Sequence, residues 1–175
     1  MTWQDDLATF ARERGPALVG YARLLTGDPA SAEDLVQEAV VRAWSRLRTG
    51  GDVVWLEAYV RRTVLHLYVS QSRRERAWRE RVRLIRDPDA HTPEHGAVDR
   101  VDIAVALTRL SPRERTCVVL RFYDDLTVPD IAQRLDLSEG AVKRYLSDGT
   151  RRLGPLLGIA GDLDTEDLTP NGGRR

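Results

Sequence analysis

Two short helical patterns separated by a tight connection occupy residues 127–153, and they constrain the fold more than any other stretch. Thr127 is followed three residues later by Asp130, which is the spacing of a capping box at a helix start. After the connection Asp136-Leu137, Ser138 can cap a second helix. A helix, a short turn and a second helix are the layout of a helix-turn-helix, whose second helix enters the DNA major groove in many DNA-binding proteins.

The second of these helices is predicted to be amphipathic. Its apolar stripe is Val142, Leu146 and Leu153, with Gly149 on the same side. The residues that then point outward are largely basic: Lys143, Arg144, Ser147 and Arg151. An ordinary helical hairpin in a bundle is the alternative. The small Ala132 at the expected crossing of the two helices, together with the basic outer face, favours DNA binding.

Length and composition limit the class of protein. A chain of 175 residues suits one large or two small domains, and its 42% hydrophobic residues suffice for globular cores. Cys117 is the single cysteine, which excludes a disulfide framework and a cysteine metal cluster, and we expect it to be buried. No apolar run reaches membrane-spanning length, and the first ten residues lack the pattern of a signal peptide. We therefore expect a cytoplasmic protein without membrane insertion.

The net charge of zero conceals an uneven distribution. Residues 1–86 carry 15 basic against 11 acidic side chains, and residues 99–160 carry 10 against 9. Between them, residues 87–98 contain three acids, no base, and Pro, Gly and His without periodicity. We interpret 87–98 as a linker between two domains, its histidines as incidental rather than metal-binding, and residues 161–175 as a disordered acidic tail.

The segment 31–47 is predicted to be a helix that Ser31 caps. Asp34, Gln37, Glu38 and Val41 fall at positions i, i+3, i+4 and i+7, so they line one outward face. Two acids and an amide on one face suit a basic partner. The alternative is an ordinary solvated face, which the residues alone favour.

A long helix is predicted from about residue 53 to residue 86, and it becomes increasingly basic. Residues 70–86 hold seven arginines against two acids. Guanidinium groups match phosphates well, and a basic stripe beside aromatic residues suits single-stranded or partly melted nucleic acid. A salt-bridged solvent helix is the alternative, which the excess of arginine disfavours.

The remaining patterns are also helical. A helix is predicted over residues 3–25 with a kink or break at Gly15-Pro16. A second is predicted over 103–110, and a third begins after Ser111, with Pro112 at its first position, and packs through Val118, Val119 and Phe122. The predicted fold is therefore all-α, with two small helical domains at 1–86 and 99–160. No catalytic or cofactor motif occurs in the sequence, so we expect neither an enzyme nor a cofactor or metal.

Three of these stretches resemble one protein family. Residues 24–44, LLTGDPASAEDLVQEAVVRAW, resemble region 2.1–2.2 of the extracytoplasmic-function (ECF) sigma factors of bacterial RNA polymerase. Residues 59–76, YVRRTVLHLYVSQSRRER, resemble region 2.3–2.4, especially of the SigE-like actinobacterial subgroup, and residues 106–146 resemble region 4. The resemblance covers roughly residues 5–155 in the expected order. It implies an initiation factor that binds core polymerase, directs it to promoters and aids melting of the minus-ten element.

The resemblance also implies roles for individual residues. The face formed by Asp34, Gln37 and Glu38 would dock on the clamp coiled coil of the largest polymerase subunit. The stretch 59–76 would capture non-template bases at the minus-ten element and hold the adjacent backbone, through Tyr59, Arg62, His66, Tyr68, Arg73, Arg74 and Arg76. The helix 138–152 would enter the major groove at the minus-thirty-five element, through Ser138, Glu139, Lys143, Arg144, Ser147 and Arg151.

Several positions depart from the family pattern. His66 stands where relatives usually carry Asn, and Gln71 where they carry Trp. Tyr145, Asp148 and Gly149 replace Gln or Arg, Arg, and Ala. Asp148 would repel a nearby phosphate and Gly149 would weaken the helix by about 1 kcal/mol, so altered or weaker minus-thirty-five recognition is expected.

The family resemblance implies partners as well. We expect core polymerase, duplex and melted promoter DNA and an anti-sigma factor as partners, and a monomeric free protein. Two alternatives leave part of the pattern unexplained: a helix-turn-helix regulator that acts without polymerase, and a helical adaptor that does not bind DNA.

Overall fold

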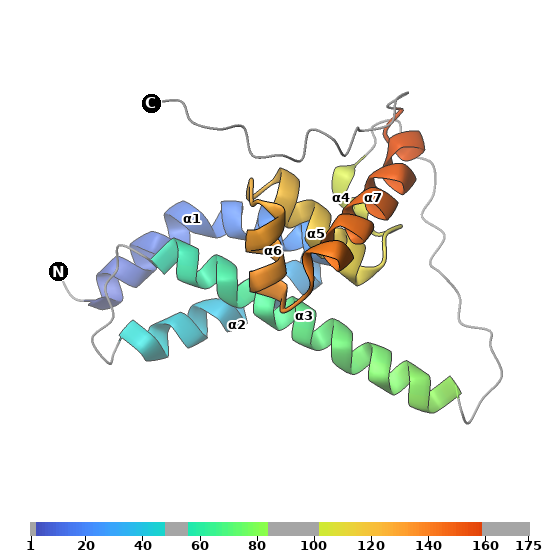
Figure 1. The fold of residues 1–175 in the computed structure, drawn as a ribbon. Coiled ribbons are helices and arrows are strands. Elements are labelled where there is room, and N and C mark those ends of the chain that lie inside the picture. Colours follow the sequence, from blue (N-terminus) through green and yellow to red (C-terminus); the bar gives the residue numbers. More distant parts are fainter. Residues whose placement is uncertain (1–2, 48–55, 84–101, 159–175) are drawn as a thin grey trace. The chain divides into compact units, whose positions relative to one another are not determined.

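The computed structural model describes residues 3–47, 56–83 and 102–158, and these residues form helices joined by turns, with no strand among them (Figure 1). The chain divides into two compact units, Met1–Asp99 and Arg100–Arg175. The predicted all-α fold of two helical domains is confirmed. The predicted linker at 87–98 and the predicted tail at 161–175 lie outside the described residues, so the proposed domain bounds stay predictions.

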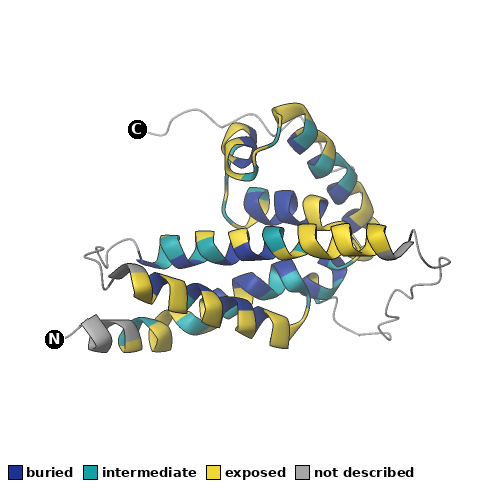
Figure 2. Cartoon of the chain, turned by 90° about the horizontal axis from the view of Figure 1, so that it is seen from below, coloured by how far each residue is buried: buried dark blue, intermediate teal, exposed yellow. Residues whose placement is uncertain are grey.

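The first unit is a bundle of three helices: α1 (Trp3–Thr26), α2 (Pro29–Leu47) and α3 (Leu56–Arg83). Each helix packs against the other two. The buried faces that meet between them are dark in Figure 2 and include Leu18, Tyr21, Leu25, Leu35, Ala39, Ala43, Val60 and Val64. Burial of one apolar stripe per helix is what stabilises such a bundle, and it leaves the opposite faces free to carry polar chemistry.

The connection between α1 and α2 differs from the prediction. Gly27 has a φ of 75°, a left-handed conformation that suits glycine and lets the chain turn after α1. Asp28 then accepts a hydrogen bond from the backbone nitrogen of Ser31 at 2.8 Å, and this bond holds the pKa of Asp28 below its usual value. Ser31 is therefore not the cap: α2 begins two residues earlier, at Pro29, because Asp28-Pro29 supplies a capping carboxylate followed by proline at the first helical position.

Proline inside α1 does not divide it. Pro16 lies within the single helix α1, so the alternative of two separate helices is wrong. One missing backbone donor is tolerated where the second half of the helix is anchored by buried side chains such as Leu18, Tyr21 and Leu25.

The second unit contains α4 (Ile103–Leu107), α5 (Pro112–Phe122), α6 (Val128–Leu135) and α7 (Glu139–Leu156). Capping boxes are present at Ser111 with Glu114 and at Thr127 with Asp130, as the spacing predicted. Between α6 and α7, Asp136 adopts the left-handed conformation with φ 55° and ψ 54°, and this makes the tight turn. Ser138 caps α7 through a 3.2 Å bond from the backbone nitrogen of Ala141. The predicted helix-turn-helix is confirmed.

The core of this unit forms where α7 crosses α5. Val142, Leu146, Gly149 and Leu153 are all buried, as predicted. A Cβ atom on Gly149 would lie only 2.9 Å from Cγ2 of Val118, so glycine permits the close approach of the two helices. The close packing of α5 and α7 thereby offsets the low helix propensity of Gly149. The prediction that Gly149 weakens the helix took no account of this packing.

Helix α5 supplies most of the remaining core, but its end differs from the prediction. Val118, Val119 and Cys117 are buried, whereas Phe122 is exposed. Cys117 is 0% exposed, and burial raises the pKa of its thiol to about 12. Phe122 is the last residue of α5, where the chain turns away from the core, so its packing was predicted wrongly.

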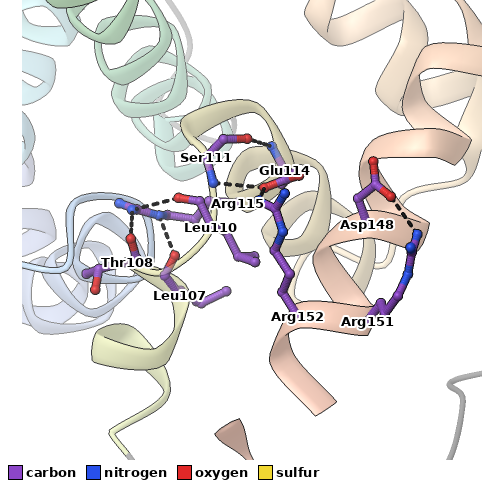
Figure 3. Close-up of polar contacts among 9 residues, drawn as sticks. All are labelled: Leu107, Thr108, Leu110, Ser111, Glu114, Arg115, Asp148, Arg151 and Arg152. Carbon is purple, nitrogen blue, oxygen red and sulfur yellow. Dashed lines mark hydrogen bonds and ion pairs between the residues drawn. The ribbon is translucent and has the colours of Figure 1, made fainter. Parts of the chain in front are cut away.

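Two arginines tie the second unit together (Figure 3). The buried Arg115 donates through Nε to the carbonyl of Leu107 at 2.8 Å and through Nη2 to the carbonyls of Thr108 at 3.1 Å and Leu110 at 3.3 Å. These carbonyls belong to the last residue of α4 and to the turn between α4 and α5, so Arg115 fixes that turn against α5. Arg152 of α7 pairs with the buried Glu114 of α5 at 2.9 Å. The orientation of α7 is thus fixed by packing and by polar contacts.

None of the described helices is both long enough and apolar enough to cross a lipid bilayer.

Candidate nucleic-acid and polymerase interfaces

The outward face of α2 carries the predicted docking residues. Asp34, Gln37 and Glu38 are all exposed, and Val41 on the same face is 63% exposed. The opposite face of the helix is core, which gives the three polar residues a rigid support. Glu38 accepts a hydrogen bond from Arg42 at 2.6 Å, one turn further along. Because both side chains of that pair are about half exposed, the pair is weak and a basic partner can displace it.

The first half of α3 presents a stripe of three predicted base-contacting residues. Tyr59, Arg62 and His66 fall at i, i+3 and i+7, and the structure leaves Arg62 and His66 exposed and Tyr59 half-buried. Tyr68 is different, because it is 7% exposed and belongs to the core of the bundle. Its ring offers little surface to a base in this conformation, whereas the side chains of the other three residues are at least partly accessible.

The second half of α3 is exposed on every side from Arg73 to Arg81 (Figure 2). Arg76 pairs with Glu80 at 3.1 Å and Arg79 pairs with Glu75 at 3.6 Å, so both acids are used. Within the described part of the chain, no ion pair engages the three remaining arginines, Arg73, Arg74 and Arg81. The net positive charge that favoured a polyanion-binding surface is therefore available on the helix.

Sequence reasoning did not single out Trp78. Its side chain is 66% exposed. Trp78 follows Arg74 by four residues and precedes Arg81 by three, so it falls on the same face of the helix as these two arginines. The spacing was readable from the sequence. An indole on that face adds a stacking surface of the kind that single-stranded nucleic acids use.

The outer face of α7 carries the predicted duplex contacts. Glu139, Lys143, Arg144 and Arg151 are exposed and Ser147 is half-buried. Ser138 is exposed, but its hydroxyl already accepts the capping bond. Arg151 pairs with Asp148 at 2.6 Å on the same helix (Figure 3). Asp148 was expected to act only by repelling phosphate, whereas in the structure it also holds Arg151.

A second contact that the sequence did not reveal joins α5 to α7. Arg113 donates through Nη1 to the phenol oxygen of Tyr145 at 3.1 Å. The guanidinium carbon of Arg144 lies 5.3 Å from the centre of the same ring. The hydrogen bond from Arg113 lowers the pKa of the Tyr145 phenol, and Arg144 lowers it further. Arg113 is 32 residues away in sequence, so only the fold brings it to the face of α7.

Clusters of three or more His, Cys, Asp or Glu side chains that could hold a metal ion do not occur among the described residues.

Comparison with known proteins matches both units to one family. The family model for sigma-70 region 2 matches residues 10–79, and the model for sigma-70 region 4 matches residues 100–153. The first contains the α2 and α3 faces and the second contains the α7 face.

Whole-chain relatives agree. The chain is 33% identical over 166 residues to the RNA polymerase sigma-E factor of Streptomyces coelicolor, covering 91% of this chain and 89% of that protein. It is 34% identical over 151 residues to the ECF RNA polymerase sigma factor SigL of Mycobacterium tuberculosis, covering 81% of this chain and 82% of that protein.

A solved structure shares the fold. The sigma factor RpoE of Bartonella quintana, in complex with the anti-sigma factor NepR, is similar with a TM-score of 0.58 and 24% identity, covering 87% of this chain and 99% of that chain. Together with the sequence matches, this confirms the resemblance seen in the three sequence stretches. The chain belongs to the extracytoplasmic-function sigma factors of the sigma-70 family, which are transcription initiation factors and not enzymes.

Proposed function

We propose that this sigma factor binds core RNA polymerase through the α2 face formed by Asp34, Gln37 and Glu38. The observation that carries the proposal is that all three side chains are exposed on one face of a helix whose other face is buried. Two carboxylates and an amide on a rigid support suit a basic coiled coil, because complementary charge steers and orients such a contact. The proposed place of action is the cytoplasm.

The proposed minus-ten contact lies on α3. Tyr59, Arg62 and His66 form one accessible stripe, which is the arrangement expected for residues that accept unstacked bases of the non-template strand. Arg73, Arg74 and Arg76 follow on the exposed half of the same helix, where they can hold the phosphates of that strand. The protein would thereby aid melting without covalent chemistry.

The proposed minus-thirty-five contact lies on α7. Lys143 and Arg144 stand near the capped N-terminal end of the second helix of the helix-turn-helix, where such helices contact base edges. Replacement of Arg144 by Ala is expected to cost roughly 1–3 kcal/mol and to relax specificity at one base pair if the guanidinium reads guanine. A uniform loss across promoter sequences would instead make Arg144 a phosphate contact.

Run-off transcription with purified core polymerase tests the docking proposal. The double variant Asp34→Arg/Glu38→Arg reverses two charges on the α2 face, and we expect promoter-specific transcript to disappear. Glu13→Arg is the control, since Glu13 is also an exposed acid of the first unit but lies on α1 and not on α2. Normal transcription by the double variant, or an equal loss in the control, would overturn the proposal.

The same assay separates the alternative of a regulator that acts without polymerase. Specific duplex binding by the chain alone, together with no effect of the double variant on transcription, would favour that alternative.

The partner that would hold the free protein inactive is proposed to be an anti-sigma factor that covers the polymerase-binding face. The similar RpoE structure is itself a complex with an anti-sigma factor. A competition experiment, in which purified core polymerase displaces that partner, tests whether the two share the α2 face. The tail at 161–175 is a second candidate for inhibition, and unchanged promoter binding and transcription after its deletion would exclude it.

A further inference from the structure

The N-terminal end of α5 meets the outer face of α7 at one aromatic side chain. Tyr145 is half-buried, while Arg113 and Arg144 on either side of it are exposed. Arg113 is bound at the phenol oxygen, at 3.1 Å, and Arg144 lies by the ring, at 5.3 Å from its centre. One ring thus orients two guanidinium groups that come from two helices.

The chemistry of this tether differs from that of the other polar contacts on α7. Arg151 is paired with the carboxylate of Asp148 and Arg152 with that of Glu114, so a negative charge lies beside each of them. The protonated phenol of Tyr145, in contrast, is a neutral acceptor and places no negative charge beside Arg113. Tyr145 therefore fixes the direction of Arg113 without cancelling its charge.

The remaining donors of Arg113 stay available for a second partner. A guanidinium carries five N–H groups in a fixed plane, and the phenol oxygen uses one of them. Planar, charged forks of this kind bind phosphate in a bidentate manner. In helix-turn-helix proteins, residues outside the recognition helix hold the DNA backbone while that helix reads bases.

We propose that Arg113 binds a backbone phosphate of the minus-thirty-five duplex and that Tyr145 is the positioning residue that holds Arg113 and Arg144 in their DNA-binding orientation. This inference rests on the proposed function of α7. It adds a contact from α5 that lies outside the predicted site, and it gives a role to a tyrosine at a position where the family pattern has Gln or Arg.

Fluorescence anisotropy with the full-length chain tests the inference. The probe is a labelled duplex that has been selected from a random-sequence library by the protein together with core polymerase. The full-length chain is then titrated against this duplex at a series of salt concentrations. Arg113→Gln is expected to lower affinity about threefold to tenfold and to reduce the slope of log affinity against log salt by about one. Arg109→Gln, which removes an exposed arginine from the turn before α5, is the matched control and should leave the slope unchanged.

Tyr145→Phe separates positioning from charge. The variant keeps the ring beside Arg144 and the charge of Arg113, but removes the phenol oxygen. We expect a loss of about threefold with the salt slope retained, and no further loss when the substitution is added to Arg113→Gln. Equal losses in both backgrounds, or an unchanged affinity for Arg113→Gln, would overturn the inference.

Lys143→Gln distinguishes failure of the inference from failure of the proposed function. If Lys143→Gln weakens binding and Arg113→Gln does not, α7 binds DNA and only the α5 contact is wrong. If neither substitution weakens binding, the proposed α7 interface is wrong as well.

Discussion

Two basic surfaces of this sigma factor are built in different ways. The exposed half of α3 carries arginines whose observed ion pairs, Arg76 with Glu80 and Arg79 with Glu75, lie within the helix itself. The face of α7 also has a pair within the helix, Arg151 with Asp148, but it adds contacts to another helix, from Glu114 to Arg152 and from Arg113 to Tyr145. The arginine side chains on α3 are therefore loosely held, whereas those on α7 are oriented by contacts to a second helix.

The difference matches the two kinds of DNA that the surfaces are proposed to bind. Exposed i,i+4 pairs are worth only about 0.3–0.5 kcal/mol each, so the α3 arginines retain most of their rotamer freedom. That freedom suits a melted strand, whose phosphates have no fixed spacing. Duplex DNA has regular phosphate positions, and side chains oriented in advance lose less entropy on binding it. The comparison predicts that substitutions on α7 and α5 affect stability and that those on the end of α3 do not.

The largest effect is expected for Arg115→Met. The substitution removes the Arg115 donors from the carbonyls of Thr108 and Leu110 and leaves the carbonyl of Leu107 only its bond from the backbone nitrogen of Leu110, and we expect a loss of about 3 kcal/mol in the second unit. Arg74→Met on the exposed half of α3 is the matched control and should change stability by less than about 0.5 kcal/mol. Hydrogen exchange of the α5 and α3 amides measures both, and similar losses for the two variants would break the comparison.

A smaller loss, of about 1–2 kcal/mol, is expected for Gly149→Ala. The added Cβ meets Cγ2 of Val118 at 2.9 Å, and the resulting strain exceeds the gain in helix propensity of about 1 kcal/mol. Gly140→Ala in the same helix is the control, because a Cβ added there would have no such neighbour within 4 Å and the substitution should be neutral or stabilising. Thermal unfolding measures both. Adding Val118→Ala should relieve part of the Gly149→Ala penalty, and strict additivity of the two would contradict the close approach.

An increase in duplex affinity of about twofold, near 0.5 kcal/mol, is expected for Asp148→Asn. The change removes the acid that holds Arg151 and lies on the proposed DNA-binding face, so the freed guanidinium can pair with phosphate. Anisotropy titration measures the change. In an Arg151→Gln background only the smaller, repulsive part of the effect should remain, and an undiminished gain there would show that Asp148 acts without Arg151.

The smallest effect is expected for Glu80→Gln on α3. Loss of the exposed pair with Arg76 should lower the stability of the first unit by no more than about 0.5 kcal/mol, and high salt should abolish the difference. Thermal unfolding at low and high salt measures this. A larger, salt-insensitive loss would mean that the α3 arginines are as firmly held as those of α7.

Local patterns predicted most of the fold. Thr127 with Asp130, Ser111 with Glu114, and the stripe from Val142 to Leu153 were readable because capping and helical periodicity depend on residues three or four positions apart. Ser31 was misassigned as a cap because two capping residues, Asp28 and Ser31, stand within one turn, and the proline between them decides which one the helix uses.

Contacts between distant segments were not predictable in the same way. Arg113 and Tyr145, or Gly149 and Val118, become neighbours only when α5 and α7 pack, and no spacing rule connects them. Tyr68 shows the converse, since an aromatic residue in a basic helix looks available for stacking until the bundle buries it. The residue types on the three proposed faces could therefore be predicted from the sequence, whereas the contacts that orient them could be identified only from the folded structure.

The reactivity of Cys117 can be used to measure opening of the second unit. It is the single cysteine of the chain, and it lies fully buried on α5 with a thiol pKa of about 12. Only thiolate reacts with alkylating probes, so labelling requires the helices around Cys117 to separate first. The alkylation rate of Cys117 in the full-length chain therefore measures how often the second unit opens. It can be compared with and without DNA or polymerase, and no residue has to be introduced for the measurement.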